Sequence, residues 1–333
     1  MRKLLPFEKI KRDVFVRQEA ETSPKFGHDF EALPIDQLLQ YCVINVDKSA
    51  GPTSHQVSAY VQKILGVSKG GHSGTLDPKV TGVLPVAIGR ATRIVQALLV
   101  AGKEYICLMH LHKEVDKERL LKTFEKFTGK IAQLPPIKSA VKRRVRFRKI
   151  YYIELLDMID KDVLFRVGTQ AGTYIRKLVH DMGVSLGTGA HMHQLRRSKA
   201  GPFAEDSLCT LHELTDAFHY YKADGNEKPL RKVLQPIENA VGHLPKVWIT
   251  DMTVDPLCHG ANLAVPGIAK VHTDIQVGEL VALMTLKNEL VAIGDTRMIS
   301  KEMVKEDKGI AIDVHKVFMA PGTYPRYEKP ASV

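Results

Sequence analysis

The sequence predicts an α+β protein of two domains: a larger domain in which helices flank a sheet, and a smaller, mostly β domain. Its 333 residues are enough for two domains that each bury a core. Between residues 41 and 245, strand-like stretches alternate with amphipathic helical ones, whereas residues 246–325 contain short strands punctuated by glycine and proline. Residues 1–40 show little periodicity, so we expect an extended arm there, and a short tail at 326–333.

The larger domain is expected to begin with a strand and a capped helix. Tyr41–Asp47 has the composition of a strand, and the turn after it supplies Thr53 or Ser54 as a helix cap. The helix should end near Gly66. Its buried face should consist of the apolar residues that recur at helical spacing, namely Val57, Tyr60, Val61, Ile64 and Leu65.

Helical and strand patterns alternate further along the chain. Glu104–Leu111 is apolar on both faces and should be a central strand. A helix is expected at Ala91–Ala101, with Ile94, Val95, Leu98 and Leu99 facing the core, and another at Asp116–Lys126, with Leu120, Leu121 and Phe124 facing the core. A further helix should be capped by Thr173 and should end at Gly183. Strands are expected at Ile150–Leu156, Val163–Gly168, Ala311–Val314 and Val317–Met319, and as a hairpin of Leu280–Thr285 with Leu290–Gly294.

Composition limits the classes of function. The net charge is +11, and residues 41–249 hold the excess, with 32 basic and 19 acidic side chains, which indicates a polyanionic partner. The longest apolar run, Ile94–Gly102, is far shorter than the roughly 20 residues of a membrane span. The amino terminus lacks the apolar core of a signal peptide. We therefore expect a cytoplasmic protein without a membrane partner.

Neither cysteine nor histidine spacing indicates a metal site. The four cysteines are scattered without a C-x-x-C pair, which argues against a disulfide framework and against a thiolate zinc site. His110/His112 and His191/His193 form two H-x-H pairs, but cysteine or carboxylate partners are missing at familiar spacing. We therefore expect no metal.

The most unusual stretch is Gly70–Pro85, GGHSGTLDPKVTGVLP, a glycine-rich loop with a single carboxylate. Glycine allows backbone conformations and close approaches that a side chain would block. Pro78 biases Asp77 away from helical geometry. Because Asp before Pro is common in ordinary turns, Asp77 has two interpretations. It is either a turn residue or a nucleophile or base held at the floor of a cleft.

Two further stretches fit the second interpretation. Arg176 lies in the first turn of a predicted helix, where it is either a surface arginine or a cation that keeps a nearby carboxylate ionised and aimed. Lys138–Lys149, KSAVKRRVRFRK, has seven basic residues in twelve and no acid. It is a solvated basic face, a targeting signal, or a loop that grips a phosphate backbone.

A series of motifs resembles the TruB-type pseudouridine synthases, and more closely their dyskerin branch, which acts in guide-RNA particles of the H/ACA class. The motifs are Lys48–His55 (KSAGPTSH), Gly71–Pro78 (GHSGTLDP), Thr81–Pro85, Ala101–Tyr105, Pro135–Pro136, Ser139–Lys142, Gly172–Arg176 (GTYIR) and Leu195–Arg197, while His259–Leu263 and Val265–Ala269 resemble a PUA domain. The resemblance implies a catalytic domain at 41–245 with a mixed, largely antiparallel sheet, an RNA-binding PUA domain at 246–325, and an arm that packs on the PUA surface.

The resemblance also implies roles for single residues. Asp77 corresponds to the aspartate that attacks the target uridine, Arg176 to the arginine that pairs with it, and Tyr105 to the tyrosine that stacks on the uracil and helps in proton removal. Contacts with substrate RNA are implied for Lys48, for His72, which holds the nucleotide out of its stack, for Ile175 and Leu195, and for the thumb-loop residues Lys142, Arg143, Arg144, Arg146 and Arg148. Such a reaction needs a flipped base. It needs no cofactor, because bonds are rearranged within one nucleotide.

Partners follow from the same resemblance. They are a guide RNA, substrate rRNA and tRNA, a small zinc-ribbon protein, a glycine-rich-family protein and a kink-turn-binding protein. The chain stops at Val333 without a long lysine-rich tail, which favours an archaeal protein. We therefore expect an RNA pseudouridine synthase that takes part in rRNA and tRNA processing and in ribosome biogenesis.

The sequence leaves two alternatives to this function and excludes a third. A stand-alone tRNA T-loop pseudouridine synthase would act without a guide. A non-catalytic RNA-binding scaffold would have no need to keep Asp77, Tyr105 and Arg176 together. A nucleotide-dependent oxidoreductase is excluded, because Gly187–Gly189 lacks the third glycine of the dinucleotide fingerprint, where Met192 stands, and the sequence has no P-loop.

Overall fold

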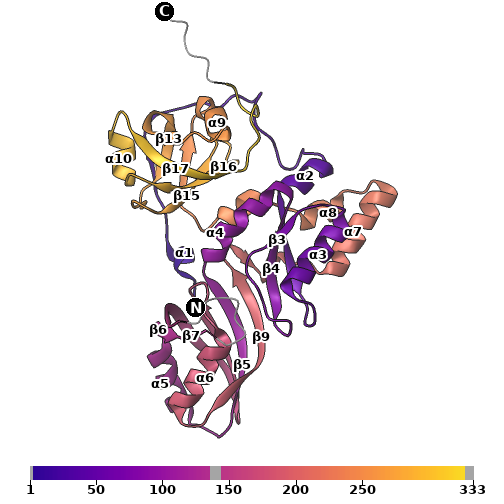
Figure 1. The fold of residues 1–333 in the computed structure, drawn as a ribbon, viewed down its shortest axis with the longest axis vertical. Coiled ribbons are helices and arrows are strands. Elements are labelled where there is room, and N and C mark those ends of the chain that lie inside the picture. The colour runs from indigo at the N-terminus through magenta and orange to yellow at the C-terminus, as the bar shows by residue number, and fades with distance from the viewer. Residues whose placement is uncertain (1–2, 136–143, 327–333) are drawn as a thin grey trace, which may run out of the picture. The chain divides into compact units, whose positions relative to one another are not determined.

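The computed structural model describes residues 3–135 and 144–326, and these form two compact units (Figure 1). The first unit comprises Met1–Lys9, Val43–Ile88 and Ile94–Gln235, and the second comprises Ile10–Cys42, Gly89–Arg93 and Pro236–Val333. Among the described residues, no helix is long and apolar enough to cross a membrane.

A mixed, largely antiparallel sheet forms the first unit, as expected. Its strands follow the order β11-β2-β4-β9-β5-β8-β7-β6, with β3 paired to β4 and β10 paired to β9. The pair β4 and β9 is parallel, whereas β5 pairs antiparallel with both of its neighbours and is therefore central, as predicted. The strands are β2 (Cys42–Lys48), β3 (Gly70–His72), β4 (Thr81–Ile88), β5 (Lys103–Leu111), β6 (Gly129–Gln133), β7 (Arg146–Ile159), β8 (Asp162–Thr169), β9 (Ala190–Ala200), β10 (Phe203–Ala204) and β11 (Gln235–Pro236).

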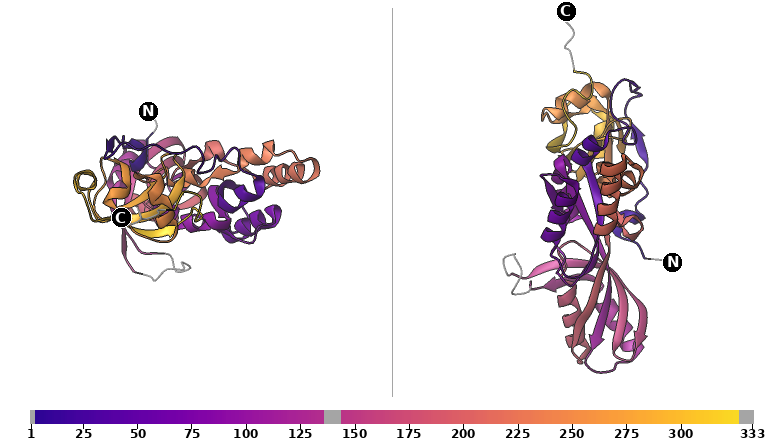
Figure 2. Two further views of the ribbon diagram at one scale, coloured as in Figure 1. Left: turned by 90° about the horizontal axis from the view of Figure 1, so that it is seen from above. Right: turned by 90° about the vertical axis from the view of Figure 1, so that its right-hand side faces the viewer.

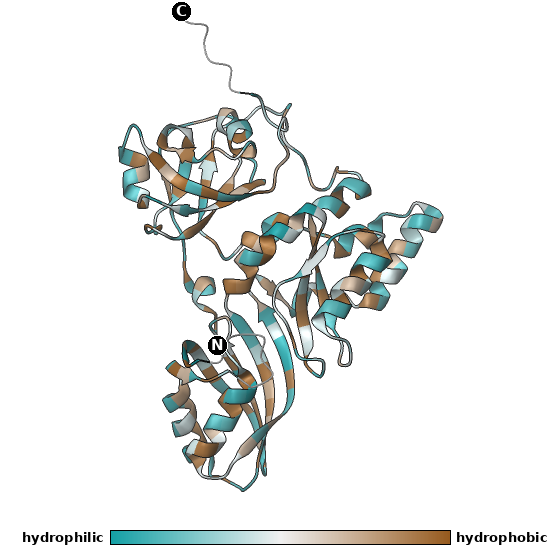
Figure 3. Cartoon of the chain, in the orientation of Figure 1, coloured by the Kyte–Doolittle hydropathy of each residue, from teal (hydrophilic) through white to brown (hydrophobic). Residues whose placement is uncertain are grey.

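Helices of the first unit bury their apolar stripes against this sheet. Helices α5 and α6 lie on one face of the long strands (Figures 1 and 2), where Leu120, Phe124, Val179 and Met182 join a hydrophobic cluster with β5 and β8. Hydrophobic and hydrophilic segments alternate along these elements (Figure 3), as amphipathic packing requires. The helices are α1 (Pro6–Lys9), α3 (Ser54–Leu65), α4 (Val95–Val100), α5 (Lys117–Phe127), α6 (Ile175–Leu186), α7 (Leu211–Asp224) and α8 (Lys228–Val233), with the 3₁₀ turn η2 (Glu205–Ser207). The 3₁₀ turn η1 (Gly89–Ile94), which precedes α4, belongs to the second unit except for its last residue.

Helix α3 has the ends that the sequence predicts. The Thr53 hydroxyl accepts a hydrogen bond from the Gln56 N–H, and the Gln56 side chain accepts one from the Thr53 N–H, which makes a capping box. Gly66 ends the helix with a φ of 67°. The prediction that Tyr60 is buried is wrong: its ring is exposed, because Val57, Val61 and Leu65 define the buried stripe and Tyr60 lies at its edge.

Helix α6 differs from the prediction at both ends. Gly183 lies inside the helix, and a Cβ atom there would come within 2.3 Å of the Ala190 nitrogen, so this glycine lets α6 approach β9. The helix ends at Gly187, whose φ is 71°. The Thr173 side chain does not cap the helix, because its hydroxyl donates to the Gln170 carbonyl at 2.7 Å.

Three other predictions of local structure are wrong. The expected helix over Ala91–Ala101 is split into η1 and α4, and Ala97 is buried where Leu99 was expected. Leu121 is likewise exposed, on the outer face of α5. The predicted loop Gly70–Pro85 ends inside the buried strand β4, which begins at Thr81. Because both faces of β4 are buried, its residues are apolar without alternation, and periodicity could not identify it.

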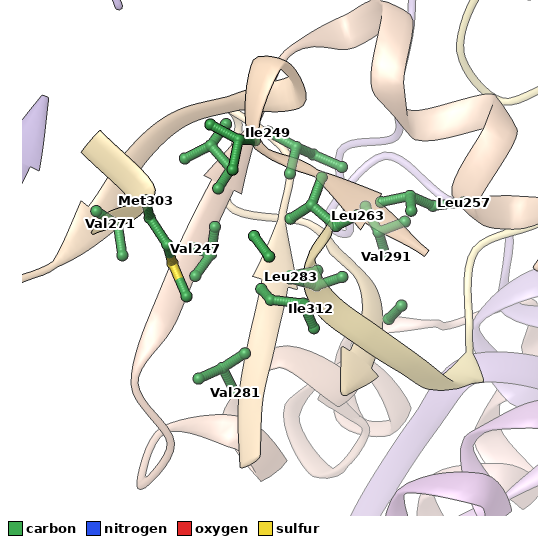
Figure 4. Close-up of a cluster of buried hydrophobic side chains, with 14 of the residues drawn as sticks. Val247, Ile249, Leu257, Leu263, Val271, Val281, Leu283, Val291, Met303 and Ile312 are labelled. Carbon is green, nitrogen blue, oxygen red and sulfur yellow. The ribbon is translucent and has the colours of Figure 1, made fainter. Parts of the chain in front are cut away.

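The second unit is a smaller, mostly β fold with its own core. Its sheet has the order β1-β14-β12-β15-β16-β17-β13, and β12 and β15 are its parallel pair. The buried side chains labelled in Figure 4, among them Val247, Leu283 and Ile312, fill the space between the strands and α9. The elements are β1 (Val14–Val16), α2 (Ile35–Tyr41), η3 (Ile237–Val241), β12 (Lys246–Ile249), α9 (Asp251–Cys258), β13 (Leu263–Ala264), η4 (Val265–Gly267), β14 (Ile268–His272), β15 (Leu280–Met284), β16 (Leu290–Thr296), α10 (Ser300–Lys305) and β17 (Ile310–Val317).

The predicted hairpin of the second unit is confirmed by the antiparallel pair β15 and β16. The two strands expected between Ala311 and Met319 are instead the single strand β17. The arm contributes β1, which pairs antiparallel with β14, and its Ser23 N–H donates to the Asp251 carboxylate at 2.9 Å. The arm therefore adds a strand to the sheet and does not need a core of its own.

His272, on β14, is held in its neutral form. Its Nδ1 atom accepts a hydrogen bond from the Lys246 N–H at 2.9 Å, so that nitrogen carries no proton. Burial, and then the positive charge of Arg12, lower the pKa of His272 to about 4.

Candidate active site

Asp77 lies in a turn whose neighbours are anchored while its carboxylate stays accessible. The Val80 N–H donates to the Asp77 carbonyl at 2.9 Å, and the next residue back, Leu76, is buried. The Leu76 N–H donates to the hydroxyl of Ser54, on α3, at 2.8 Å. The Asp77 side chain itself is 52% exposed. The loop therefore presents one carboxylate from a rigid support.

Lys48 holds the same loop through hydrogen bonds to its backbone carbonyls. Its side chain is fully buried, and its ammonium group donates to the carbonyls of Ser49 at 2.9 Å, Pro78 at 3.0 Å and Val80 at 2.8 Å. Burial lowers the pKa of Lys48, while the charge of Asp77 raises it. Because an ammonium has three N–H donors, all of them are occupied. Lys48 was expected to contact RNA, and in this structure its donors hold the Asp77 turn instead.

Arg176 pairs with Asp77. One guanidinium nitrogen of Arg176 contacts the Asp77 carboxylate, and the arginine side chain is 60% exposed. The first turn of α6 places Arg176, and Gln133, at the end of β6, fixes that turn: its side-chain amide donates to the Tyr174 carbonyl at 3.1 Å and accepts from the Tyr174 N–H at 3.0 Å. A buried amide thus sets the position of the arginine relative to the carboxylate.

Tyr105 lies on β5, directly opposite Arg197 on β9. The Tyr105 side chain is partly buried against the hydrophobic cluster under the sheet. Arg197 is buried, with Nε donating to the Val83 carbonyl at 2.7 Å and one terminal nitrogen donating to the Gly74 carbonyl at 3.3 Å. Gly82, with a φ of 101°, permits this approach, because a Cβ atom there would lie 2.2 Å from the Arg197 carbonyl oxygen.

His72 ends β3 and lies beside His55. The two rings meet edge to face with centroids 4.7 Å apart. Burial, then the nearby His55 and Arg197, lower the pKa of His72. The imidazole is therefore neutral at neutral pH and offers one N–H donor and one acceptor.

The two apolar residues expected to touch RNA lie at the edge of the core. Ile175, which begins α6, is a buried member of the cluster beneath the sheet. Leu195, on β9, is partly buried and packs against the same cluster. Leu195 therefore keeps some apolar surface accessible, and Ile175 keeps little.

Basic side chains follow the hairpin of β6 and β7. Lys142 and Arg143 lie outside the described residues. Arg144 is exposed, and Arg146 is the first residue of β7. The Arg148 guanidinium lies against the loop that leads into α6, because a Cβ atom at Gly172 would be 3.1 Å from Arg148 Nε. Phe147 between them is 59% exposed. Exposed cations with an exposed ring suit a nucleic-acid strand.

The two H-x-H pairs come together on neighbouring strands. His110 and His191 are paired residues of β5 and β9, His112 Nε2 and His191 Nδ1 are 3.2 Å apart, and His110 contacts Asp162 at 2.7 Å. In residues 3–135 and 144–326, no three cysteine, histidine or acidic side chains are grouped as a metal ion would require.

Sequence similarity to known proteins covers nearly the full chain. A "Probable tRNA pseudouridine synthase B" of Thermococcus onnurineus is 57% identical over 328 residues, which are 98% of this chain and 98% of the relative. The Pyrococcus furiosus protein of the same name is 56% identical and covers 98% of this chain and 96% of its own length. This chain belongs to the TruB family of pseudouridine synthases. The TruB family N-terminal domain matches residues 62–175 and the tRNA pseudouridylate synthase B C-terminal domain matches residues 176–242.

Two further domain models and the solved structures complete this comparison. A DKCLD domain matches residues 3–58 and a PUA domain matches residues 245–318. This TruB-family chain is similar to one chain of a crystal structure of a Cbf5-Nop10-Gar1 complex, with a TM-score of 0.94, 56% identity, and coverage of 97% of this chain and 99% of that one. It is also similar to a chain in a structure of an H/ACA RNP bound to a substrate RNA containing 2'-deoxyuridine, with a TM-score of 0.92, 54% identity, and coverage of 97% and 99%.

Three residues that support the TruB-family site were not singled out from the sequence. The sequence predicts Ser54 only as a candidate helix cap, whereas in the structure its hydroxyl also accepts a hydrogen bond from the N–H of Leu76, the residue before Asp77. Gln133 precedes the proline pair and belongs to no periodic pattern. Arg197 was only part of a quoted motif, Leu195–Arg197. Strand β9 is mostly exposed or half-buried before Arg197 and is buried without alternation from Arg197 to Ala200, so its hydrophobic pattern gave no signal of a buried arginine.

Proposed function

We propose that this protein is an RNA pseudouridine synthase that converts uridine to pseudouridine in rRNA and tRNA as the catalytic subunit of a guide-RNA particle. The observation that carries the proposal is the pairing of Asp77 with Arg176 on a loop anchored by Ser54 and Lys48, in a chain of the TruB family. A single accessible carboxylate with a fixed cation beside it is suited to nucleophilic attack.

In this proposal Asp77 is the nucleophile. The N1–C1′ bond of the uridine breaks, a C5–C1′ bond forms, C5 loses a proton and N1 gains one, so the reaction is an isomerisation without a cofactor. Arg176 aims the Asp77 carboxylate, because its guanidinium contacts one carboxylate oxygen. Tyr105 stacks on the detached uracil and assists in removing the C5 proton.

We also propose the residues that hold the RNA. Neutral His72 helps to keep the target nucleotide out of its stack, and Leu195 and Ile175 line the apolar side of the base pocket. The exposed Arg144 and the half-buried Arg146 and Arg148, together with Lys142 and Arg143, grip the phosphate backbone. Lys48 acts on the RNA only through Asp77, because its own donors are occupied.

Guide RNA and partner proteins come from the similarity to H/ACA complexes. We propose that the particle contains a guide RNA, a small zinc-ribbon protein of the Nop10 kind and a glycine-rich protein of the Gar1 kind. The motifs of the sequence imply a kink-turn-binding protein as a further partner. The second candidate is a stand-alone enzyme acting on the tRNA T-loop, which the names of the relatives favour.

One assay separates the two candidates. Purified protein is given a guide-selected RNA and a free tRNA, each with and without guide RNA and partner proteins, and pseudouridine is mapped in every product. We expect modification of the guide-selected uridine only when the guide is present. Efficient modification of free tRNA by the protein alone, with no gain from guide or partners, would favour the stand-alone enzyme.

The division of the chain is part of the same proposal: an arm at 1–40, a catalytic domain at 41–245, a PUA domain at 246–325 and a tail at 326–333, in a cytoplasmic protein. Limited proteolysis that releases a fragment beginning near residue 246 would support the boundary, and cuts confined to other positions would contradict it. Fractionation of the producing cells tests the location, and recovery in the membrane pellet would contradict it.

A further inference from the structure

Arg197 is a buried cation whose hydrogen bonds all go to uncharged groups. It is 1% exposed. Among the described residues it has no carboxylate partner: Nε donates to Val83 and a terminal nitrogen donates to Gly74, both backbone carbonyls. Burying a guanidinium without a carboxylate partner is costly. A methionine or a leucine would fill such a position without burying a charge, so the guanidinium needs an explanation.

The surroundings of Arg197 belong to the proposed active site. Gly74 lies three residues before Asp77 on the same loop, and Val83 lies on β4, which that loop leads into. On the neighbouring strand, Tyr105 is the residue directly opposite Arg197. Burial lowers the pKa of Arg197, and the adjacent hydroxyl of Tyr105 raises it through a side-chain hydrogen bond. The guanidinium thus contacts the nucleophile loop and the tyrosine at once.

A β-bulge makes this arrangement possible. Glu104 pairs with Lys199 and Tyr105 pairs with Arg197, so Ser198 is an extra residue on β9. The extra residue shifts the alternation, and the side chains of Arg197, Ser198 and Lys199 are all buried. Bulges are common beside active sites because they re-aim a side chain. Here the bulge directs Arg197 toward the Asp77 loop, while Ser198 donates to Glu104 at 2.8 Å.

We propose that Arg197 is a positioning residue that fixes the Tyr105 hydroxyl relative to the Gly74 end of the nucleophile loop. Its rigid, planar set of five N–H donors can reach two carbonyls and a hydroxyl together, which a lysine cannot do with the same geometry. This inference rests on the proposed function, since Tyr105 and Asp77 are assigned to the isomerisation there. Arg197 itself does not touch RNA, because its side chain is buried.

The test is a double-mutant cycle in the full particle, with single-turnover rates at saturating RNA. Arg197→Met is expected to slow the reaction about 100-fold, as a misplacement near 1 Å does. RNA affinity should stay unchanged. Tyr105→Phe, which deletes only the hydroxyl, should slow the wild-type enzyme, but should slow the Arg197→Met enzyme by a factor of about 2 or less. Arg197→Lys should recover part of the rate. Arg166→Met, on β8 of the same sheet, is the matched control and should leave the rate unchanged.

Hydrogen exchange of the RNA-free protein gives a readout that does not depend on activity. Arg197→Met should speed exchange of the amides at residues 70–77, and Arg197→Lys should partly restore protection. Rate losses that multiply in the double mutant would overturn the link to Tyr105, and unchanged exchange at 70–77 would overturn the link to the loop. A wild-type particle that makes no pseudouridine would contradict the proposed function, while the exchange data would still decide whether Arg197 holds the loop.

Discussion

Replacing Lys48 by methionine tests whether the buried Lys48 ammonium group holds the nucleophile loop in place. The ammonium group of Lys48 donates to three carbonyls, two of which, those of Pro78 and Val80, follow Asp77 within three residues. Methionine fills similar space but leaves these carbonyls without the donor. Each buried carbonyl left unpaired costs about 1 kcal/mol or more, so the loss for three is about 3 kcal/mol, reduced by whatever is gained from removing a buried charge.

Two measurements follow for Lys48→Met. The free energy of unfolding, from urea denaturation, should fall by about 2 to 4 kcal/mol. RNA affinity should keep the salt dependence of the wild type, because a buried ammonium neutralises no phosphate. Lys79→Met, an exposed neighbour on the same loop, is the control and should not change stability. An unchanged unfolding energy, together with a salt slope reduced by about 0.7 to 0.9, would refute this reasoning and make Lys48 an RNA contact.

Three other changes give further predictions. Gln133→Ala should slow single-turnover pseudouridine formation about 10-fold or more, because the start of α6 loses both hydrogen bonds that place the arginine opposite the nucleophile. The double change Arg146→Ala and Arg148→Ala should weaken RNA binding and reduce the slope of log affinity against log salt by about 1 to 2. His272 has a folded-state pKa below its unfolded value of about 6.5. Neutral His272 therefore does not reduce the free energy of unfolding above pH 6.5. As the pH falls from 6.5 toward 4, the free energy of unfolding should decrease by about 1 to 3 kcal/mol, after allowance for the partial exposure of the ring. His272→Asn should remove that pH dependence.

Each of these has a control. Gln133→Glu keeps one acceptor for the backbone N–H and should retain more activity than Gln133→Ala; equal rates for both variants would contradict the clamp. For the arginines, an unchanged salt slope on substrate RNA would show that they do not touch phosphate. For the histidine, denaturation of wild type and variants is compared between pH 7 and pH 4.5. His315→Asn, at an exposed site, should behave as the wild type, and a wild-type curve for His272→Asn would refute the assignment.

The sequence was most informative where neighbours along the chain make the structure. The cap of α3, expected at Thr53 or Ser54 and found at Thr53, the end of α3 at Gly66 and the hairpin of β15 and β16 depend on local chemistry, and the sequence predicted them. The same holds for β5, whose apolar faces mark a central strand. Asp77 was recognisable because glycine, aspartate and proline stand together in one stretch of sequence.

The failures share one cause, which is contact between distant parts of the chain. Gly183 has the sequence signature of a helix end, but its missing side chain serves the approach of β9. Likewise, nothing local shows that the carbonyls of Pro78 and Val80, about 30 residues further on, accept hydrogen bonds from Lys48, whose contact with RNA stays a prediction. Arg197 was overlooked because a bulge, which has no local sequence signal here, turns it inward.

The central claim, that Asp77 carries out the isomerisation, is tested most directly by Asp77→Asn in a particle reconstituted with guide RNA and partners. Asparagine keeps the shape of the loop but cannot act as the nucleophile. With RNA binding measured in parallel and Asp162→Asn as the control carboxylate, we expect binding to persist and pseudouridine at the guided position to be abolished. Appreciable turnover by Asp77→Asn, with the same guided uridine modified, would contradict the account.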